Sequence, residues 1–148
     1  MICPVGGGGL LAGTALTVKG RSPSTRVIGA EPKAADDAQR SLASGSIEPS
    51  HDPKTIADGL RTSLGEKPFS IIKENVDSIV TATEPEILEA MRFVWERFKM
   101  IIEPSCAVPV APVYNRQLPV KGLRVGIIIT GGNVDLEPLF AELAAKWL

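Results

Sequence analysis

The sequence Met1-Ile-Cys-Pro-Val-Gly-Gly-Gly-Gly-Leu-Leu-Ala-Gly13 decides the fold class. Its first five residues are typical of a short buried strand, and residues 10–19 place Leu10, Leu11, Ala15 and Val18 on one face of a helix. Four consecutive glycines join the two elements. A strand that enters a helix through glycines indicates an α/β protein, in which ligands bind at the carboxyl ends of the strands.

The same alternation continues along the chain. Further strands are expected at residues 26–30, 77–83 and 123–129, and further helices at residues 32–42, 68–75, 84–100 and 135–147. Thr83 is a good N-cap with Glu86 at the capping-box position, whereas Pro109 and Pro112 should interrupt a helix at residues 105–114. The pattern predicts an open, mostly parallel sheet with helices on both faces, in one partial domain covering residues 1–148. Two helices are expected to turn apolar stripes inward: Ile87, Met91, Val94, Trp95 and Phe98 on one, and Leu136, Leu139, Phe140, Leu143 and Trp147 on the other.

Composition excludes several classes of protein. The chain has 148 residues, with 16 basic and 17 acidic side chains, so it carries no field that would bind nucleic acid. Its longest apolar run, near residues 125–130, is too short to cross a membrane. Two cysteines and one histidine supply neither a disulfide framework nor a zinc site. A reduced, cytoplasmic setting is therefore expected.

The glycine run predicts a phosphate site. Gly6, Gly7, Gly8 and Gly9 would let backbone amides approach an anion at the positive end of the next helix dipole. No Lys-Ser/Thr pair follows, so the run is not a Walker A loop. On spacing alone, a dinucleotide-binding module remains possible, with the fingerprint Gly7, Gly9 and Ala12 and with Glu31 as the ribose acid. A non-catalytic domain that docks onto an enzyme subunit is a second alternative.

Five motifs that span nearly the whole chain carry a resemblance to a known family. In order, they are Pro4-Val-Gly-Gly-Gly-Gly-Leu-Leu-Ala-Gly13, Ile28-Gly-Ala-Glu-Pro32 with Ala35-Asp-Asp37, Thr55-Ile-Ala-Asp-Gly-Leu-Arg61, Glu103-Pro-Ser105 and Thr130-Gly-Gly-Asn-Val-Asp-Leu136. Together they resemble the C-terminal part of a fold-type-II pyridoxal-phosphate enzyme. Within that family they are most similar to the group of serine racemases, serine/threonine dehydratases and hydroxyaspartate dehydratases. The resemblance implies a lyase or isomerase of amino-acid metabolism that dehydrates and deaminates serine, threonine or hydroxyaspartate, or racemises serine.

The resemblance also implies which residues bind the cofactor. Gly6, Gly7, Gly8 and Gly9, with the amide of Leu10, would hold the 5′-phosphate of pyridoxal phosphate. Thr130 would hydrogen-bond the pyridine nitrogen, where most of this group has serine. A neutral hydroxyl in that position leaves the ring unprotonated, which suits loss of a β-hydroxyl.

A divalent-cation site is implied in the same way. Glu31, the carbonyl of Ala35 and Asp37 match the metal ligands of the racemase group. Two carboxylates and a carbonyl suit Mg²⁺, or Ca²⁺ or Mn²⁺ in its place, in a structural role. The residues themselves also allow a simpler interpretation, in which the acidic pair at positions 36 and 37 only favours the start of a helix.

Other family features are missing from this sequence. The lysine that forms the Schiff base in the family belongs to an N-terminal segment that has no match here, so we expect no catalytic residue in this chain and no activity from it alone. The expected partners are a small β-hydroxy amino acid, the missing N-terminal half or a complementary chain, and a second copy in a homodimer of the complete protein. Cys106, Pro109 and Pro112 also depart from the Gly/Ala-rich helix usual in the family.

Overall fold

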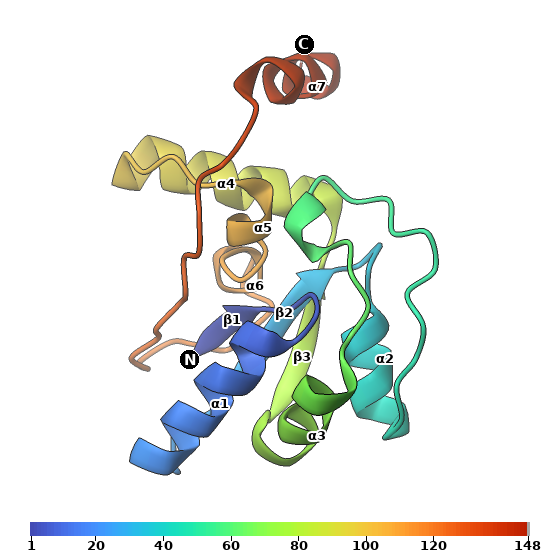
Figure 1. Ribbon diagram of the computed structural model, residues 1–148. Coiled ribbons are helices and arrows are strands. Elements are labelled where there is room, and N and C mark those ends of the chain that lie inside the picture. Colours follow the sequence, from blue (N-terminus) through green and yellow to red (C-terminus); the bar gives the residue numbers. More distant parts are fainter. Residues whose placement is uncertain (148) are drawn as a thin grey trace.

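A parallel sheet of three strands forms the centre of the computed structural model, which describes residues 1–147 (Figure 1). The strands are β1 (Ile2–Pro4), β2 (Ile28–Pro32) and β3 (Ser78–Ala82), and their spatial order is β1-β2-β3. In register, Cys3 lies opposite Gly29, which lies opposite Ile79. The alternation of side chains then directs Cys3 and Ile79 to one face of the sheet and Ile2, Ile28 and Ala82 to the other.

Helices cover both faces, as the sequence predicts. On the face of Cys3, α1 (Gly9–Arg21) packs against α3 (Glu66–Asn75), and Leu11, Ala15 and Ile72 are buried between them and the sheet. The opposite face is covered by α4 (Glu84–Phe98) with two short helices, α5 (Pro104–Ala107) and α6 (Ala111–Tyr114). α2 (Asp37–Ser44) lies beside β3, and the 3-10 turn η1 (Asp58–Leu60) contacts α5.

Local sequence signals account for the boundaries of three of these helices, α4, α5 and α6. The expected capping box begins α4: the amide and the hydroxyl of Thr83 both lie 2.8 Å from Glu86 Oε2. The expected helix at residues 105–114 is divided into α5 and α6, with Pro109 in the break and Pro112 in the first turn of α6. Proline removes an amide donor inside a helix and is tolerated in its first turn, which explains both positions.

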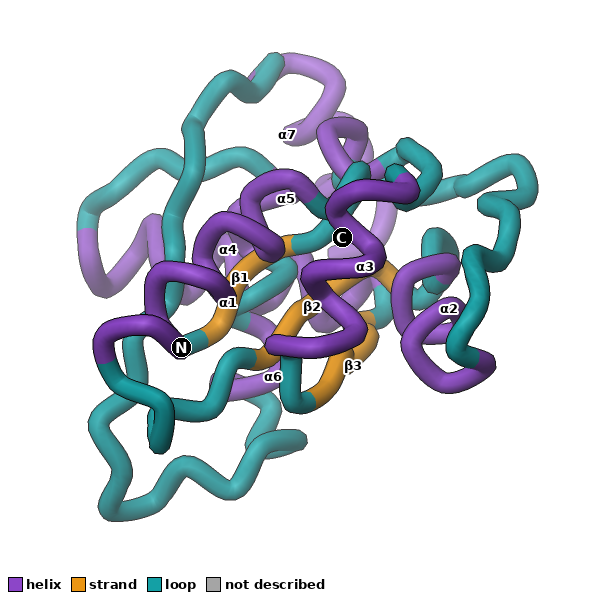
Figure 2. Tube along the Cα trace, turned by 60° about the horizontal axis from the view of Figure 1, so that its bottom comes forward, coloured by secondary structure: helices purple, strands orange, loops and turns teal. Residues whose placement is uncertain are grey.

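The structure corrects the prediction of a fourth strand at residues 123–129. Residues 123–129 touch the sheet through a single parallel bridge, from Ile127 to Ile2, and otherwise belong to the long loop between α6 and α7 (Leu136–Trp147) (Figure 2). On the side of β1 that faces residues 123–129, Ile2 forms both hydrogen bonds of the bridge, and the next residue on that side is Pro4, which has no amide hydrogen to continue the pairing. Leu123 is 65% exposed, although a strand buried on both faces was expected.

The structure also corrects the two apolar stripes that were expected to be buried, one on α4 and one on α7. On α4, Ile87, Met91 and Val94 are buried and Trp95 is partly buried, but Phe98 is 61% exposed because it lies at the last turn of the helix. On α7, Leu139 is buried, whereas Leu136 and Phe140 are exposed; the side chains of Leu143 and Trp147 lie outside the described residues. Within residues 1–147, no helix has the length and apolar character needed to cross a membrane.

Candidate functional site

The glycine loop connects the end of β1 to the start of α1, and two of its glycines are required by the fold. Gly8 has a φ of 86°, in the left-handed region that favours glycine. A Cβ on Gly8 would lie 2.6 Å from Leu64 Cδ1 and 2.9 Å from Pro68 Cβ. A Cβ on Gly6 would lie 2.9 Å from Thr62 Oγ1. The close packing of the loop against residues 59–68 therefore explains Gly6 and Gly8.

The other two glycines face open space. Gly7 and Gly9 are exposed; a Cβ on Gly9 would meet nothing within 4 Å, and one on Gly7 would meet Ser63 O and Thr62 Oγ1 no closer than 3.8 Å. Neither has a positive φ. No contact among the described residues therefore demands glycine at these two positions. A ligand that approaches the backbone closely would demand it.

The start of α1 offers hydrogen-bond donors to such a ligand. Its first helical hydrogen bond runs from Ala12 N–H to the carbonyl of Gly8, so the amides of Gly9 and Leu10 have no acceptor within the helix. Among the described residues, no side chain caps this helix end, and its first turn carries no acid. Free amides, the positive end of a helix dipole and room at Gly7 and Gly9 fit a phosphate group.

A chain of contacts leads from this loop to Thr130. Gly59, whose carbonyl lies near Gly6, donates its amide hydrogen to Ser105 Oγ at 3.1 Å. The next residue, Cys106, has its Sγ 2.9 Å from Thr130 Oγ1. The bridge between β1 and residues 123–129 brings Thr130 to the same edge of the sheet as the glycine loop. The structure thus gathers the predicted cofactor-binding residues at the carboxyl ends of the strands.

Thr130 and the glycines after it are held by two residues to which the sequence analysis assigned no role. Glu103 accepts a hydrogen bond from Asn133 N–H at 3.0 Å and donates its own amide hydrogen to the carbonyl of Gly131 at 3.2 Å. Cys106 Sγ accepts from the amides of Thr130 and Gly131. These contacts join positions 24 to 30 residues apart, so no local sequence pattern could have indicated them.

The three residues expected at the cation site lie close together in sequence and around the start of α2. Glu31 is 1% exposed, and its carboxylate accepts from the amides of Ala38 at 3.3 Å and Gln39 at 2.6 Å. Asp37 is 2% exposed and accepts from the amide of Leu64 at 3.0 Å. Glu31 therefore caps the first turn of α2 from the end of β2, a role that the sequence analysis did not foresee.

Burial also changes the proton affinity of these two carboxyl groups. It raises the pKa of Glu31 to about 8, with a further increase from the charge of Asp37, while the amides of α2 oppose the shift. The pKa of Asp37 is raised as well, first by burial. No cluster of three or more His, Cys, Asp or Glu side chains suited to a metal occurs among residues 1–147. The Glu31 carboxylate is buried against the amides of α2, whereas the ribose acid of a dinucleotide site would have to be exposed beside the glycine loop. The structure therefore does not favour the dinucleotide interpretation.

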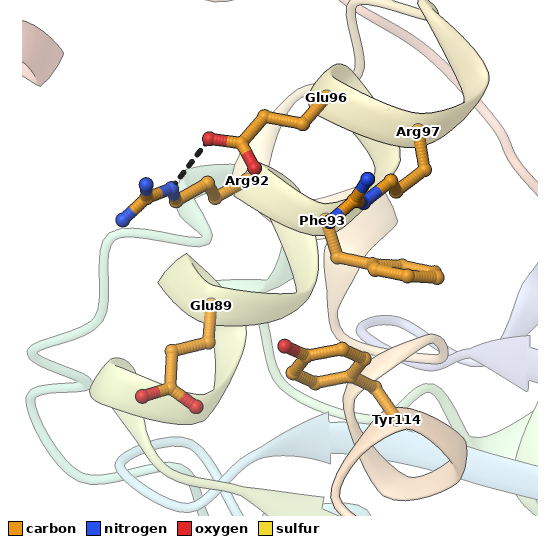
Figure 3. A pocket seen from close by; sticks show the side chains of 6 residues that line it. All are labelled: Glu89, Arg92, Phe93, Glu96, Arg97 and Tyr114. Atoms are coloured by element: carbon orange, nitrogen blue, oxygen red, sulfur yellow. Dashed lines mark hydrogen bonds and ion pairs between the residues drawn. The ribbon is translucent and has the colours of Figure 1, made fainter.

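A separate hollow of about 320 Å³ lies between α4 and α6 (Figure 3). Its lining includes Arg92, which pairs with Glu96 at 2.7 Å, and the rings of Phe93 and Tyr114, whose centroids are 4.8 Å apart. None of the predicted site residues lines it. This hollow is therefore separate from the candidate site at the glycine-loop edge of the sheet.

The chain is similar to known proteins over nearly its whole length. Residues 1–131 match the family described as pyridoxal-phosphate dependent enzyme. The chain is 45% identical over 139 residues to the beta-hydroxyaspartate dehydratase of Paracoccus denitrificans and 51% identical over 144 residues to the serine racemase of Dictyostelium discoideum. Each alignment covers 94% of this chain and 44% of the relative. The crystal structure of the Dictyostelium serine racemase superposes with a TM-score of 0.85 and 52% identity, over 90% of this chain and 43% of that chain. The chain thus spans less than half the length of these relatives.

Proposed function

Because the chain belongs to the family of pyridoxal-phosphate dependent enzymes, of the fold-type-II group with serine racemases and hydroxyaspartate dehydratases, we propose that it is the cofactor-phosphate half of an enzyme acting on β-hydroxy amino acids. The observation that carries the proposal is the open amide cradle at the start of α1, where Gly7 and Gly9 have no internal reason to be glycine. In the complete protein the substrate is serine, threonine or hydroxyaspartate. The reaction is dehydration with deamination, racemisation, or both.

Residues of this chain bind and orient the cofactor in this proposal. The amides from Gly6 to Leu10 bind the 5′-phosphate, and the hydroxyl of Thr130 donates to the pyridine nitrogen. Bound pyridoxal phosphate supplies an electron sink for the carbanion left when the substrate loses its α-proton. Dehydration then removes the β-hydroxyl, and hydrolysis of the resulting enamine gives a keto acid and ammonia. Racemisation instead returns a proton to the opposite face of the α-carbon.

The proton-transferring groups belong to another part of the protein. We propose that this chain corresponds to the C-terminal half of its relatives and that the reactive lysine lies in a segment or chain that complements it. The complete protein is then a homodimer, and this chain alone is inactive. The share of each relative that remains unmatched, more than half of its length, supports a missing complement of this size.

A structural cation is part of the same proposal. Glu31 and Asp37 are both buried, and neither forms an ion pair with a Lys or Arg among the described residues. Mg²⁺, or Ca²⁺ or Mn²⁺, held by these carboxylates and the carbonyl of Ala35 would supply the missing positive charge. The site adjoins the glycine loop because Asp37 binds the amide of Leu64, whose side chain packs against Gly8. A cation there would stabilise the cradle without contacting the cofactor ring.

Complementation tests the proposed function. The part of the Dictyostelium serine racemase outside the matched region would be co-expressed with this chain, and keto acid and ammonia released from serine and hydroxyaspartate would be measured. We expect activity from the pair and none from either part alone. Keto acid production by this chain alone would contradict the division of labour, and a stable but inactive pair that fails to bind pyridoxal phosphate would contradict the cofactor assignment.

A further inference from the structure

Cys106 makes contacts that the cofactor residues do not explain. Its Sγ lies 2.9 Å from Thr130 Oγ1, 3.1 Å from the amide nitrogen of Thr130 and 2.8 Å from that of Gly131. Backbone N–H groups can only donate, so the sulfur accepts both of these hydrogen bonds. The Cys106 side chain is fully buried, and the described residues offer its thiol hydrogen no other acceptor.

These contacts decide which atom donates in the hydrogen bond between Cys106 Sγ and Thr130 Oγ1. A thiol has one hydrogen, which is a weak donor, and the sulfur already accepts two amide hydrogens, so a third interaction is best met by donation. Thr130 Oγ1 is the acceptor within reach, so the thiol of Cys106 donates to it. The hydroxyl hydrogen of Thr130 must then point away from the sulfur. Thr130 is exposed, so that hydrogen faces the open edge of the sheet where the cofactor ring is proposed to lie.

We infer that Cys106 is a positioning residue, which fixes the hydroxyl of Thr130 as a hydrogen-bond donor toward the pyridine nitrogen. The inference rests on the proposed function. A hydroxyl fixed as a donor pairs with an unprotonated ring nitrogen, whereas a protonated nitrogen needs an acceptor. Cys106 therefore favours the neutral ring, the state that suits loss of the β-hydroxyl.

The surrounding backbone gives this side chain its importance. α5 has only four residues and ends at Ala107, before the break that contains Pro109. Residues 123–129 are joined to the sheet by one bridge only. The segment that carries Thr130 is thus not held by a long strand or a continuous helix, and Cys106 is one of the side chains that tether it to α5.

The direction of donation can be tested without a ligand. Infrared spectroscopy of the S–H stretch reports whether a thiol donates a hydrogen bond, and Cys3, whose Sγ lies 3.3 Å from the Pro4 carbonyl, is an internal reference. We expect Thr130→Val to move the Cys106 band to higher frequency and Thr130→Ser to leave it in place. A Cys106 band that does not move in Thr130→Val would overturn the inference, because the thiol would then not donate to Thr130.

The effect on the ring can be measured with pyridoxine 5′-phosphate, which lacks the aldehyde and therefore does not react with lysine. Absorbance would follow protonation of the bound ring against pH in the parent chain and in Cys106→Ala and Cys106→Ser. We expect Cys106→Ala to raise the proton affinity of the ring about three- to tenfold, the range of one hydrogen bond. Cys106→Ser keeps a hydroxyl donor and should restore the parent titration, while inorganic phosphate binds all three chains equally.

Each other outcome decides against the inference in a distinct way. If Cys106→Ala titrates like the parent, or if both variants shift alike, Cys106 does not position Thr130, and the proposed function is untouched. If the parent chain binds neither pyridoxine 5′-phosphate nor inorganic phosphate, the proposed function fails and the inference fails with it.

Discussion

Substitution of single glycines by alanine separates what the fold requires from what a phosphate requires. Gly9→Ala places a methyl group where no atom lies within 4 Å, and the Cβ of a helical residue is directed toward the helix N-terminus. The methyl group would therefore occupy the space in front of the free amides. We expect Gly9→Ala to weaken binding of pyridoxine 5′-phosphate about tenfold or more, the value of one charge-assisted hydrogen bond.

The same Gly9→Ala substitution should raise the stability of the chain while it weakens phosphate binding. Gly9 begins α1, and replacing a helical glycine by alanine stabilises a helix by up to about 1 kcal/mol. Gly13 lies in the same helix, also has open space around its Cβ, and provides the matched control. Gly13→Ala should gain similar stability in urea unfolding and bind the phosphate like the parent.

Gly8→Ala, in contrast, should lower the stability of the chain. Its φ of 86° costs an alanine about 1–2 kcal/mol, and a contact of 2.6 Å with Leu64 Cδ1 adds about 1–3 kcal/mol of overpacking. We expect a loss of about 2–5 kcal/mol in unfolding free energy. Titration calorimetry and urea unfolding of the three variants decide the matter. If Gly9→Ala binds the phosphate as tightly as Gly13→Ala does, the reasoning about the cradle is wrong.

Three further predictions concern other parts of the molecule. Without divalent cations, the unfolding free energy should fall as the pH rises from about 4.5 to about 8, because Glu31 keeps its proton in the folded chain and loses it on unfolding. The slope approaches about 1.4 kcal/mol per pH unit, which corresponds to the release of one proton on unfolding. Glu31→Gln should flatten this pH profile, and parallel profiles for the parent and the variant would contradict the prediction. Asp77→Asn should cost about 1 kcal/mol in urea unfolding, because Asp77 accepts from both Lys19 Nζ and a backbone amide, whereas Lys19→Met should cost less than about 0.5 kcal/mol; equal losses would refute the ranking. Gly132→Ala should cost about 1–3 kcal/mol in the same assay, because its Cβ would lie 2.5 Å from the carbonyl oxygen of Ile101, and an unchanged unfolding midpoint would show that this loop adapts freely.

The sequence predicts those elements whose signals are local. The capping box at Thr83 and the proline break at residue 109 are found as expected, and the first three strands begin and end within two residues of their expected positions. The prediction of a fourth strand is wrong because pairing depends on a partner, and on the facing side of β1 only Ile2 can form both hydrogen bonds, since Pro4 has no amide hydrogen. The composition of residues 123–129 carries no information about that partner.

The site shows the same division. The phosphate role of the glycine loop is a prediction from residue type, because consecutive glycines between a strand and a helix favour an anion. The role of Thr130 is a prediction that rests on the resemblance to the family. Cys106 could not, because its role depends on a contact with a residue 24 positions away. The resemblance places Glu31 at a cation site, but the sequence does not indicate that the amides of the following helix bind its carboxylate.

Binding of pyridoxal phosphate to the 148-residue chain tests the central claim most directly. Equilibrium dialysis would compare pyridoxal phosphate with pyridoxal, and borohydride reduction with peptide mapping would locate any bond to lysine. The account predicts that the phosphate form binds more tightly and that no single lysine is preferentially reduced. Equal binding of the two forms, or stoichiometric reduction at one lysine of this chain, would contradict the claim that it is the phosphate-binding half of a larger enzyme.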